Sequence, residues 1–244
     1  TLSSSSAASD VYKRQAQWPF GKWNLYDDGI RTPLVVKWPN KIKANSTSNA
    51  MVSWIDILPT ILDITGSGVL DNIDGRSFLK VLEGEKINFR SEIFTTHTGD
   101  GVFNIYPIRS IRTKRYKYIR NLLPNCYHTN HSDLLKKVRA GAYWNSWYES
   151  SKQNIKSANI ILNYHKRPSE EFYDLLTDPN EQQNLISNKS LTKQIRKLSG
   201  KLDQWMVKQK DQGVLFYSPY PLTKGIPDKK KIEFLNKKVK NLIK

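Results

Sequence analysis

The sequence predicts an α/β protein in which a strand and two helices precede a small antiparallel sheet that a long helix closes. Two periodicities support this order. Apolar residues recur at helical spacing in 51–66 and 190–210, whereas they alternate in 91–97, 108–113 and 116–122. The 244 residues include 38% hydrophobic and 11% aromatic side chains, which is enough for a packed core. One large domain or two smaller ones are expected.

The first elements are expected between residues 33 and 84. The run "PLVVKWP" (33–39) is short, β-branched and closed by proline, which is typical of a buried strand. The run "MVSWIDILPTILDITG" (51–66) predicts a helix with Pro59 in an early turn and Gly66 as its C-cap. The run "RSFLKVLEG" (76–84) predicts a second, shorter helix.

After residue 90 the period shifts towards two. The runs "SEIFTTH" (91–97), "IRSIRT" (108–113) and "YKYIRNL" (116–122) predict strands, and the two residues between the last two predict a tight turn. The run "EEFYDL" (170–175) predicts a fourth strand. Residues 190–210 place apolar side chains on one helical face, so this helix is expected to cover the sheet.

Charge and composition narrow the class of protein. The net charge of +17 raises the question of nucleic-acid binding, but the charge is dispersed and no RNP, KH, zinc-finger or helix-turn-helix signature accompanies it. A solvated basic surface is therefore expected, with no nucleic-acid partner. No run of about 18 apolar residues is present, so no membrane span is expected. A single cysteine, Cys126, excludes an internal disulfide framework.

Five motifs resemble, in their order, those of sulfatases, and in particular of bacterial proteins similar to heparan N-sulfatase (N-sulfoglucosamine sulfohydrolase). They are "GKWNLYDDGIRTPLVVKWP", "VSWIDILPTILDITG", "DGRSFLKVL", "YPIRSIRTKRYKYIRNL" and "EEFYDLLTDPNEQQNL". The resemblance covers residues 16 to 210. It implies an alkaline-phosphatase-like sulfatase fold, represented here by its last core strands and helices and a C-terminal α+β subdomain with a small antiparallel sheet.

The resemblance also implies an organisation of the chain. In the family a metal-binding Asp-Asn-Gly or Asp-His-Gly lies a few residues before the stretch similar to "WPFGK". Counting back from Lys22 places that triplet at Lys13, Arg14 and Gln15, which are unsuitable ligands for a hard divalent cation. We therefore expect a truncated sulfatase whose N-terminal catalytic half is missing. The expected segments are a linker-like, non-native stretch, the last part of the core domain, the C-terminal subdomain and a basic tail: 1–15, 16–90, 91–212 and 213–244.

The chemistry implied by the resemblance is sulfate hydrolysis by a formylglycine, made from a Cys or Ser in a Cys/Ser-x-Pro-x-Arg motif. A calcium ion held by N-terminal aspartates polarises the sulfate. Cys126 lies in "LPNCYHTNH", without Pro or Arg at the required offsets, so it is not that nucleophile. We expect the nucleophile and the calcium ligands in the missing half, no metal site in this chain, and no activity of this fragment alone.

Two other functions stay open at this stage. One is a phosphodiesterase or phosphatase of the same superfamily, with a Thr or Ser nucleophile. The other is a non-catalytic basic module that binds sulfated polysaccharide or nucleic acid. For a sulfatase the partner would be a sulfated carbohydrate, cleaved at O- or N-sulfate groups. A parent of this kind is expected in the periplasm or secreted, while the oligomeric state is left unspecified.

Lys22 is the expected catalytic residue. It matches a family position where Lys or Arg contacts the substrate sulfate, and an ammonium there would neutralise the charge that develops during cleavage. The alternative is a surface lysine whose side chain extends over Trp23.

Three residues are expected to bind substrate. His97 and Asp100 lie in "FTTHTGDG", where a strand ends and a glycine-rich turn can present side chains to a sugar hydroxyl or sulfamate. The alternative for His97 is a loop histidine with satisfied hydrogen bonds. His128 lies in "NCYHTNH", which we interpret as a loop at the substrate rim rather than a zinc site with His131.

Overall fold

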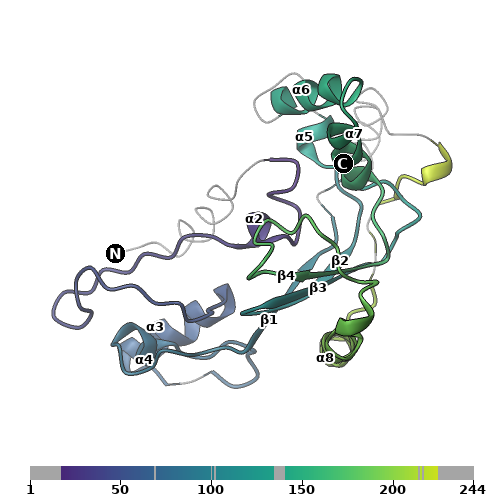
Figure 1. The fold of residues 1–244 in the computed structure, drawn as a ribbon. Helices are drawn as coiled ribbons and strands as arrows, with labels where there is room; N and C mark the ends of the chain where they lie inside the picture. The colour runs from purple at the N-terminus through teal and green to yellow at the C-terminus, as the bar shows by residue number, and fades with distance from the viewer. Residues whose placement is uncertain are drawn as a thin grey trace, which may run out of the picture. The chain divides into compact units, whose positions relative to one another are not determined.

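The computed structural model describes residues 18–68, 70–99, 101, 103–134, 141–213, 215 and 217–224. The described residues form two compact units (Figure 1). The first unit comprises the described parts of Thr1–Thr32, Phe94–Ile111 and Tyr116–Lys244, and the second comprises those of Pro33–Ile93 and Arg112–Arg115. No helix within these ranges is both long and apolar enough to cross a membrane.

A four-stranded sheet in the order β1-β2-β3-β4 organises the first unit. The four predicted strands are confirmed, as β1 (Glu92–His97), β2 (Ile108–Thr113), β3 (Tyr116–Asn121) and β4 (Glu170–Asp174). β3 and β4 pair antiparallel, with Tyr116 opposite Asp174 and Arg120 opposite Glu170. The first two residues of β1, the last two of β2 and the β2–β3 turn belong to the second unit.

Each face of the sheet carries its own apolar core. Helix α8 (Thr192–Lys208) covers one face, where Leu198 and Leu202 pack against the buried side chains of Ile111, Tyr118 and Phe172 (Figure 1). This confirms the closing helix expected in 190–210. Because neighbouring residues of a strand point to opposite faces, Ile119 lies on the other side from Tyr118. There it joins the second core of this unit, which consists of Leu25, Tyr26, Tyr106, Ile108, Cys126, Tyr173 and Leu175.

Four further helices belong to the first unit: α2 (Asp27–Ile30), α5 (His131–Leu134), α6 (Gly141–Ser151) and α7 (Ile155–His165). α6 packs against α7. The side chain of Asn154 caps α7 by accepting a hydrogen bond from the backbone of Lys156 at 2.9 Å. The sequence reasoning did not predict α6 and α7.

The second unit contains the helical segment expected in 51–66. A 3₁₀ turn, η1 (Trp54–Asp56), leads into α3 (Ile57–Thr65), and α4 (Leu79–Leu82) follows. Pro59 lies in the first turn of α3, where its missing N–H removes no helical hydrogen bond. Gly66 ends the helix with φ of 68°, in the left-handed region, so its role as C-cap is confirmed.

Asp56 holds this second unit together. Its fully buried carboxylate accepts hydrogen bonds from the backbone of Ser53 at 2.9 Å and of Arg76 at 3.0 Å. The guanidinium of Arg90 also donates to both carboxylate oxygens. Asp56 thereby links η1 to the segments that contain Arg76 and Arg90.

The strand expected in 33–39 is not formed. Residues 33–38 have no regular secondary structure, and the Val35 side chain is 90% exposed. An extended segment becomes a strand only when a neighbour accepts and donates its backbone hydrogen bonds, and no described segment pairs with this one. The prediction of a buried strand in this segment is therefore wrong.

Candidate functional site

Lys22 lies in a compact double turn at the start of the described chain. The backbone N–H of Gly21 donates to the carbonyl of Trp18, and that of Asn24 donates to the carbonyl of Gly21, both at 3.1 Å. The Lys22 side chain is only 1% exposed, and its Nζ lies 5.0 Å from the centre of the Trp23 ring. The predicted contact with Trp23 is thus present, but a surface lysine is excluded because the side chain is buried.

Trp23 takes a backbone conformation that is rare for a bulky residue. Its φ is 68°, and such left-handed geometry persists only where surrounding contacts fix it. The Trp23 carbonyl accepts a hydrogen bond from Asn104 at 3.4 Å, and its ring stacks on His131 at 4.7 Å. The ring of Phe103 also lies against His131, with the two ring centres 4.1 Å apart. His131 therefore packs against two aromatic rings.

Arg167 connects the Lys22 turn with His128. Its Nη2 donates to Oδ1 of Asn24 at 2.6 Å and contacts Nδ1 of His128 at 3.2 Å. Its Nε donates to the carbonyl of Tyr164 at 3.3 Å. Arg167 is 4% exposed and lies between α7 and β4. Sequence reasoning missed this residue, because nothing in "HKRPSEE" distinguishes it from a solvated loop arginine.

His128 has no exposed surface. Its pKa lies well below the ordinary value, first because burial disfavours the imidazolium and then because the Arg167 cation is adjacent. His128 is therefore neutral at physiological pH. His128 is as completely buried as Lys22, and its role at the substrate rim stays a prediction.

His97 ends β1 and is half-buried. Its carbonyl accepts a hydrogen bond from Nη1 of Arg109 at 3.0 Å, which fixes the end of the strand. His97 is close enough to His128 to lower its pKa electrostatically, so the two predicted histidines belong to one region. Asp100, the remaining predicted substrate ligand, lies outside the described residues.

Two buried cations, Lys22 and Arg167, thus lie in the same unit as His97 and His128, and Arg167 links the Lys22 turn to His128 through Asn24. Fixed positive charge in a poorly solvated region favours an anion strongly, since water there screens the interaction little. Such an arrangement can bind a sulfate group and stabilise negative charge that develops on it. It contains no nucleophile of its own.

The described residues do not form a calcium site. Nowhere in the described ranges do three or more His, Cys, Asp or Glu side chains come together in a way that could hold a metal ion. Calcium binding requires several oxygen ligands in one place.

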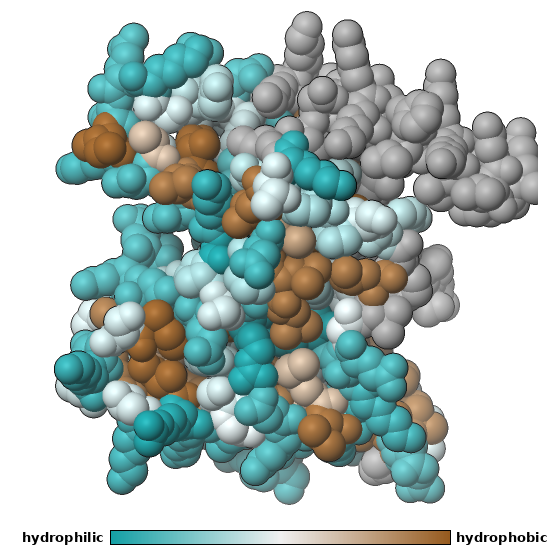
Figure 2. Space-filling model, turned by 90° about the vertical axis from the view of Figure 1, so that its right-hand side faces the viewer, coloured by the Kyte–Doolittle hydropathy of each residue, from teal (hydrophilic) through white to brown (hydrophobic). Residues whose placement is uncertain are grey.

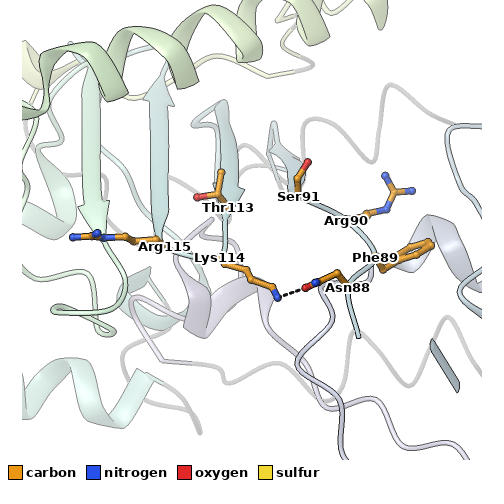
Figure 3. A pocket seen from close by; sticks show the side chains of 7 residues that line it. All are labelled: Asn88, Phe89, Arg90, Ser91, Thr113, Lys114 and Arg115. Atoms are coloured by element: carbon orange, nitrogen blue, oxygen red, sulfur yellow. Dashed lines mark hydrogen bonds between the residues drawn. The ribbon is translucent and has the colours of Figure 1, made fainter. Parts of the chain in front are cut away.

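A cavity of about 480 Å³ lies elsewhere, in the second unit (Figure 3). It is lined by Asn88, Phe89, Arg90, Ser91, Thr113, Lys114 and Arg115. The Lys114 ammonium donates to the Asn88 side chain at 2.6 Å across it. Arg90 is engaged by the buried Asp56 carboxylate. None of the predicted site residues lines this cavity.

Known proteins that are similar to this chain show its class. A solved protein in complex with its substrate D-glucosamine-2-N,6-O-disulfate shares the fold, with a TM-score of 0.53 and 23% identity over 77% of this chain and 30% of that protein. An ulvan-active sulfatase of Formosa agariphila is 34% identical over 193 residues, which are 78% of this chain and 36% of the relative. Human N-sulphoglucosamine sulphohydrolase is 29% identical over 217 residues, covering 81% of this chain and 40% of the human protein.

These relatives define an alkaline-phosphatase-like sulfatase fold, as the motifs implied. The family described as N-sulphoglucosamine sulphohydrolase, C-terminal, matches residues 16–137. The chain belongs to this family, and it spans well under half of the length of the two curated relatives.

Proposed function

We propose that the chain is part of a sulfatase that hydrolyses sulfate groups of a sulfated glycan. The observation that carries the proposal is the burial of Lys22 on a fixed turn within the segment that the family model matches. The relatives support the class, since two are sulfatases or sulphohydrolases by name and the solved one binds a sulfated glucosamine. They favour this function over a phosphodiesterase or a non-catalytic basic module.

In this proposal Lys22 contacts the sulfate and neutralises charge that grows as the S–O or S–N bond breaks. His97 and Asp100 bind hydroxyl or sulfamate groups of the sugar. His128 binds substrate from a position next to the Lys22 turn, to which Arg167 and Asn24 link it. The site is thus organised for an anionic substrate rather than for an uncharged one.

The nucleophile and the metal come from other residues of the parent enzyme. No proline of this sequence has Cys or Ser two positions before it, so the chain contains no Cys/Ser-x-Pro-x-Arg motif. Formylglycine and calcium, which supply the attacking oxygen and polarise the sulfate in this enzyme class, therefore enter the proposal only as properties of the parent.

The test is Lys22→Ala in the full-length parent, read out by kcat, KM and melting temperature. Removing one preorganised contact to developing charge lowers turnover by about 10²–10³-fold. Lys22→Arg is expected to retain part of the activity because it restores the cation. Lys152→Ala is the matched control, since Lys152 is exposed and forms an ion pair with its helical neighbour Glu149.

Normal turnover in Lys22→Ala, with only a lower melting temperature, would refute the catalytic role of Lys22. It would assign the residue to the structure of the turn instead. A rise in KM with unchanged kcat would mean that Lys22 binds substrate and transition state equally.

A further inference from the structure

Arg167 is a buried cation without a carboxylate partner among the described residues. It donates to the Tyr164 carbonyl and the Asn24 amide oxygen and contacts the His128 ring. Aromatic faces lie against its charge, with the guanidinium carbon 5.2 Å from the centre of Tyr26, and the Glu171 carboxylate interacts with it electrostatically without a direct ion pair. Burying a charge without an ion pair costs free energy. We therefore ask which groups the Arg167 guanidinium fixes in place.

On one side Arg167 holds the Lys22 turn. Oδ1 of Asn24 accepts from Arg167, which leaves the Asn24 amide nitrogen to donate to the carbonyl of Pro19 at 3.0 Å. Asn24 thereby ties the beginning of the turn to its end. The strained backbone of Trp23 lies between these two anchor points, next to Lys22. Loss of the hydrogen bond between Arg167 and Asn24 would therefore loosen the turn that holds Lys22.

On the other side Arg167 holds His128. A guanidinium only donates, so its contact with Nδ1 is a hydrogen bond when Nδ1 is the acceptor and the ring proton is on Nε2. Nε2 is buried and has no hydrogen-bond partner within the described part of the chain. A single planar group thus fixes two elements that the sequence separates by more than a hundred residues.

We propose that Arg167 is a positioning residue of this site, which fixes the Lys22 turn through Asn24 and orients the His128 imidazole through Nδ1. The assignment of a catalytic purpose rests on the proposed function. The positioning itself does not, and it is measurable in the 244-residue chain without any turnover. A lysine cannot replace Arg167, because an ammonium lacks the planar fork that reaches both partners.

The experiment compares Arg167→Met and Arg167→Lys with Arg120→Met. The control also removes one partly buried guanidinium, which on β3 contacts Ser199 and Asp203. Acylation of Lys22 by an amine reagent is followed by mass spectrometry, and the ring nitrogens of His128 by ¹⁵N NMR. All variants are compared at the same interval below their melting temperatures.

Loss of Arg167 is expected to accelerate Lys22 acylation by about tenfold or more, because labelling of a buried amine requires local opening. The ¹⁵N shifts of His128 are expected to move away from a single Nε2–H tautomer. Arg167→Lys should show both changes, whereas Arg120→Met should lower the melting temperature with neither. Unchanged labelling and unchanged ¹⁵N shifts in folded Arg167→Met would overturn the proposal.

Asn24→Ala provides the second arm if Arg167→Met does not fold. It removes the link between Arg167 and the turn, together with the bond from Asn24 to Pro19, and leaves the contact of Arg167 with His128 in place. Lys22 acylation should therefore accelerate while the His128 shifts stay near those of the unmodified chain. Slow acylation in this variant would also overturn the proposal. Neither result bears on catalysis, so failure here is distinct from normal turnover in Lys22→Ala, which would refute the proposed function.

Discussion

Glu181 is a buried carboxyl whose protonation depends on pH in the neutral range. It lies in the turn after β4, where its carboxylate contacts Lys117 at 2.8 Å and accepts from the backbone of Asp27. Lys117 has no exposed side-chain surface and contacts Asp27 at 2.6 Å as well. Two carboxylates therefore share one ammonium, and burial raises the pKa of Glu181 to about 7.

The sign of the effect on stability follows from this pKa. Between 4.5, the ordinary value for Glu, and about 7, the folded protein binds a proton that the unfolded chain does not. The free energy of unfolding therefore falls as pH rises through this window, by at most about 1.4 kcal/mol per pH unit from this group. Glu181→Gln should flatten the pH dependence of the urea midpoint between these values. Glu149→Gln, at an exposed site, should not, and an unchanged slope in Glu181→Gln would contradict the assignment.

Single residues also show where sequence reasoning ends. Alternation in "YKYIRNL" correctly predicted β3, but it does not show that Lys117 is buried. Lys117 is buried because Asp27, ninety residues earlier, and Glu181 meet it from other elements. Long-range ion pairs of this kind leave no periodic signal in the sequence. The same applies to Arg167, whose partners Asn24 and His128 lie far from it along the chain.

At the scale of elements, the docking of α8 on the sheet is the clearest test of the fold. Leu202 is fully buried in the core that α8 forms with β2, β3 and β4. Leu202→Ala removes this packing and leaves a cavity, which costs about 2–5 kcal/mol in the free energy of unfolding. Val207→Ala is the control, because Val207 lies on the same helix and is 78% exposed. Equal melting temperatures of the two variants would mean that α8 is not packed on the sheet.

The sheet strands and α8, which the sequence predicted, satisfy their apolar pattern inside this chain. The strands and α8 bury their alternating or helical faces against one another, so period and burial agree. The segment 33–39 has the pattern of a strand without a described partner, and α6 is aromatic and polar without a regular apolar face. Pattern alone therefore predicts the first group and fails for the second.

At the scale of the whole molecule, apolar side chains also gather in separate patches between hydrophilic ones on the face drawn in Figure 2. Exposed large apolar residues of the second unit include Val35, Trp54, Ile55, Leu58 and Ile61. Scattered apolar residues are normal on a protein surface, but a contiguous group is unusual. From the sequence, the order of motifs predicted the family and matched Lys22 to a family position. That Lys22 is buried could be seen only in the structure.

The described part of the chain lacks the groups that sulfate hydrolysis needs besides a cation. Sulfate hydrolysis by this class needs an attacking oxygen and a metal, and the chain has neither a Cys/Ser-x-Pro-x-Arg motif nor a metal-binding cluster among its described residues. Lys22 and Arg167 can stabilise charge, but stabilisation without a nucleophile breaks no bond. The purified 244-residue chain should therefore release no sulfate from a chromogenic aryl sulfate above the buffer rate, with or without added calcium. The full-length parent is the positive control. Calcium-dependent release by the chain alone would show that it carries a nucleophile that neither the motifs nor the described residues reveal.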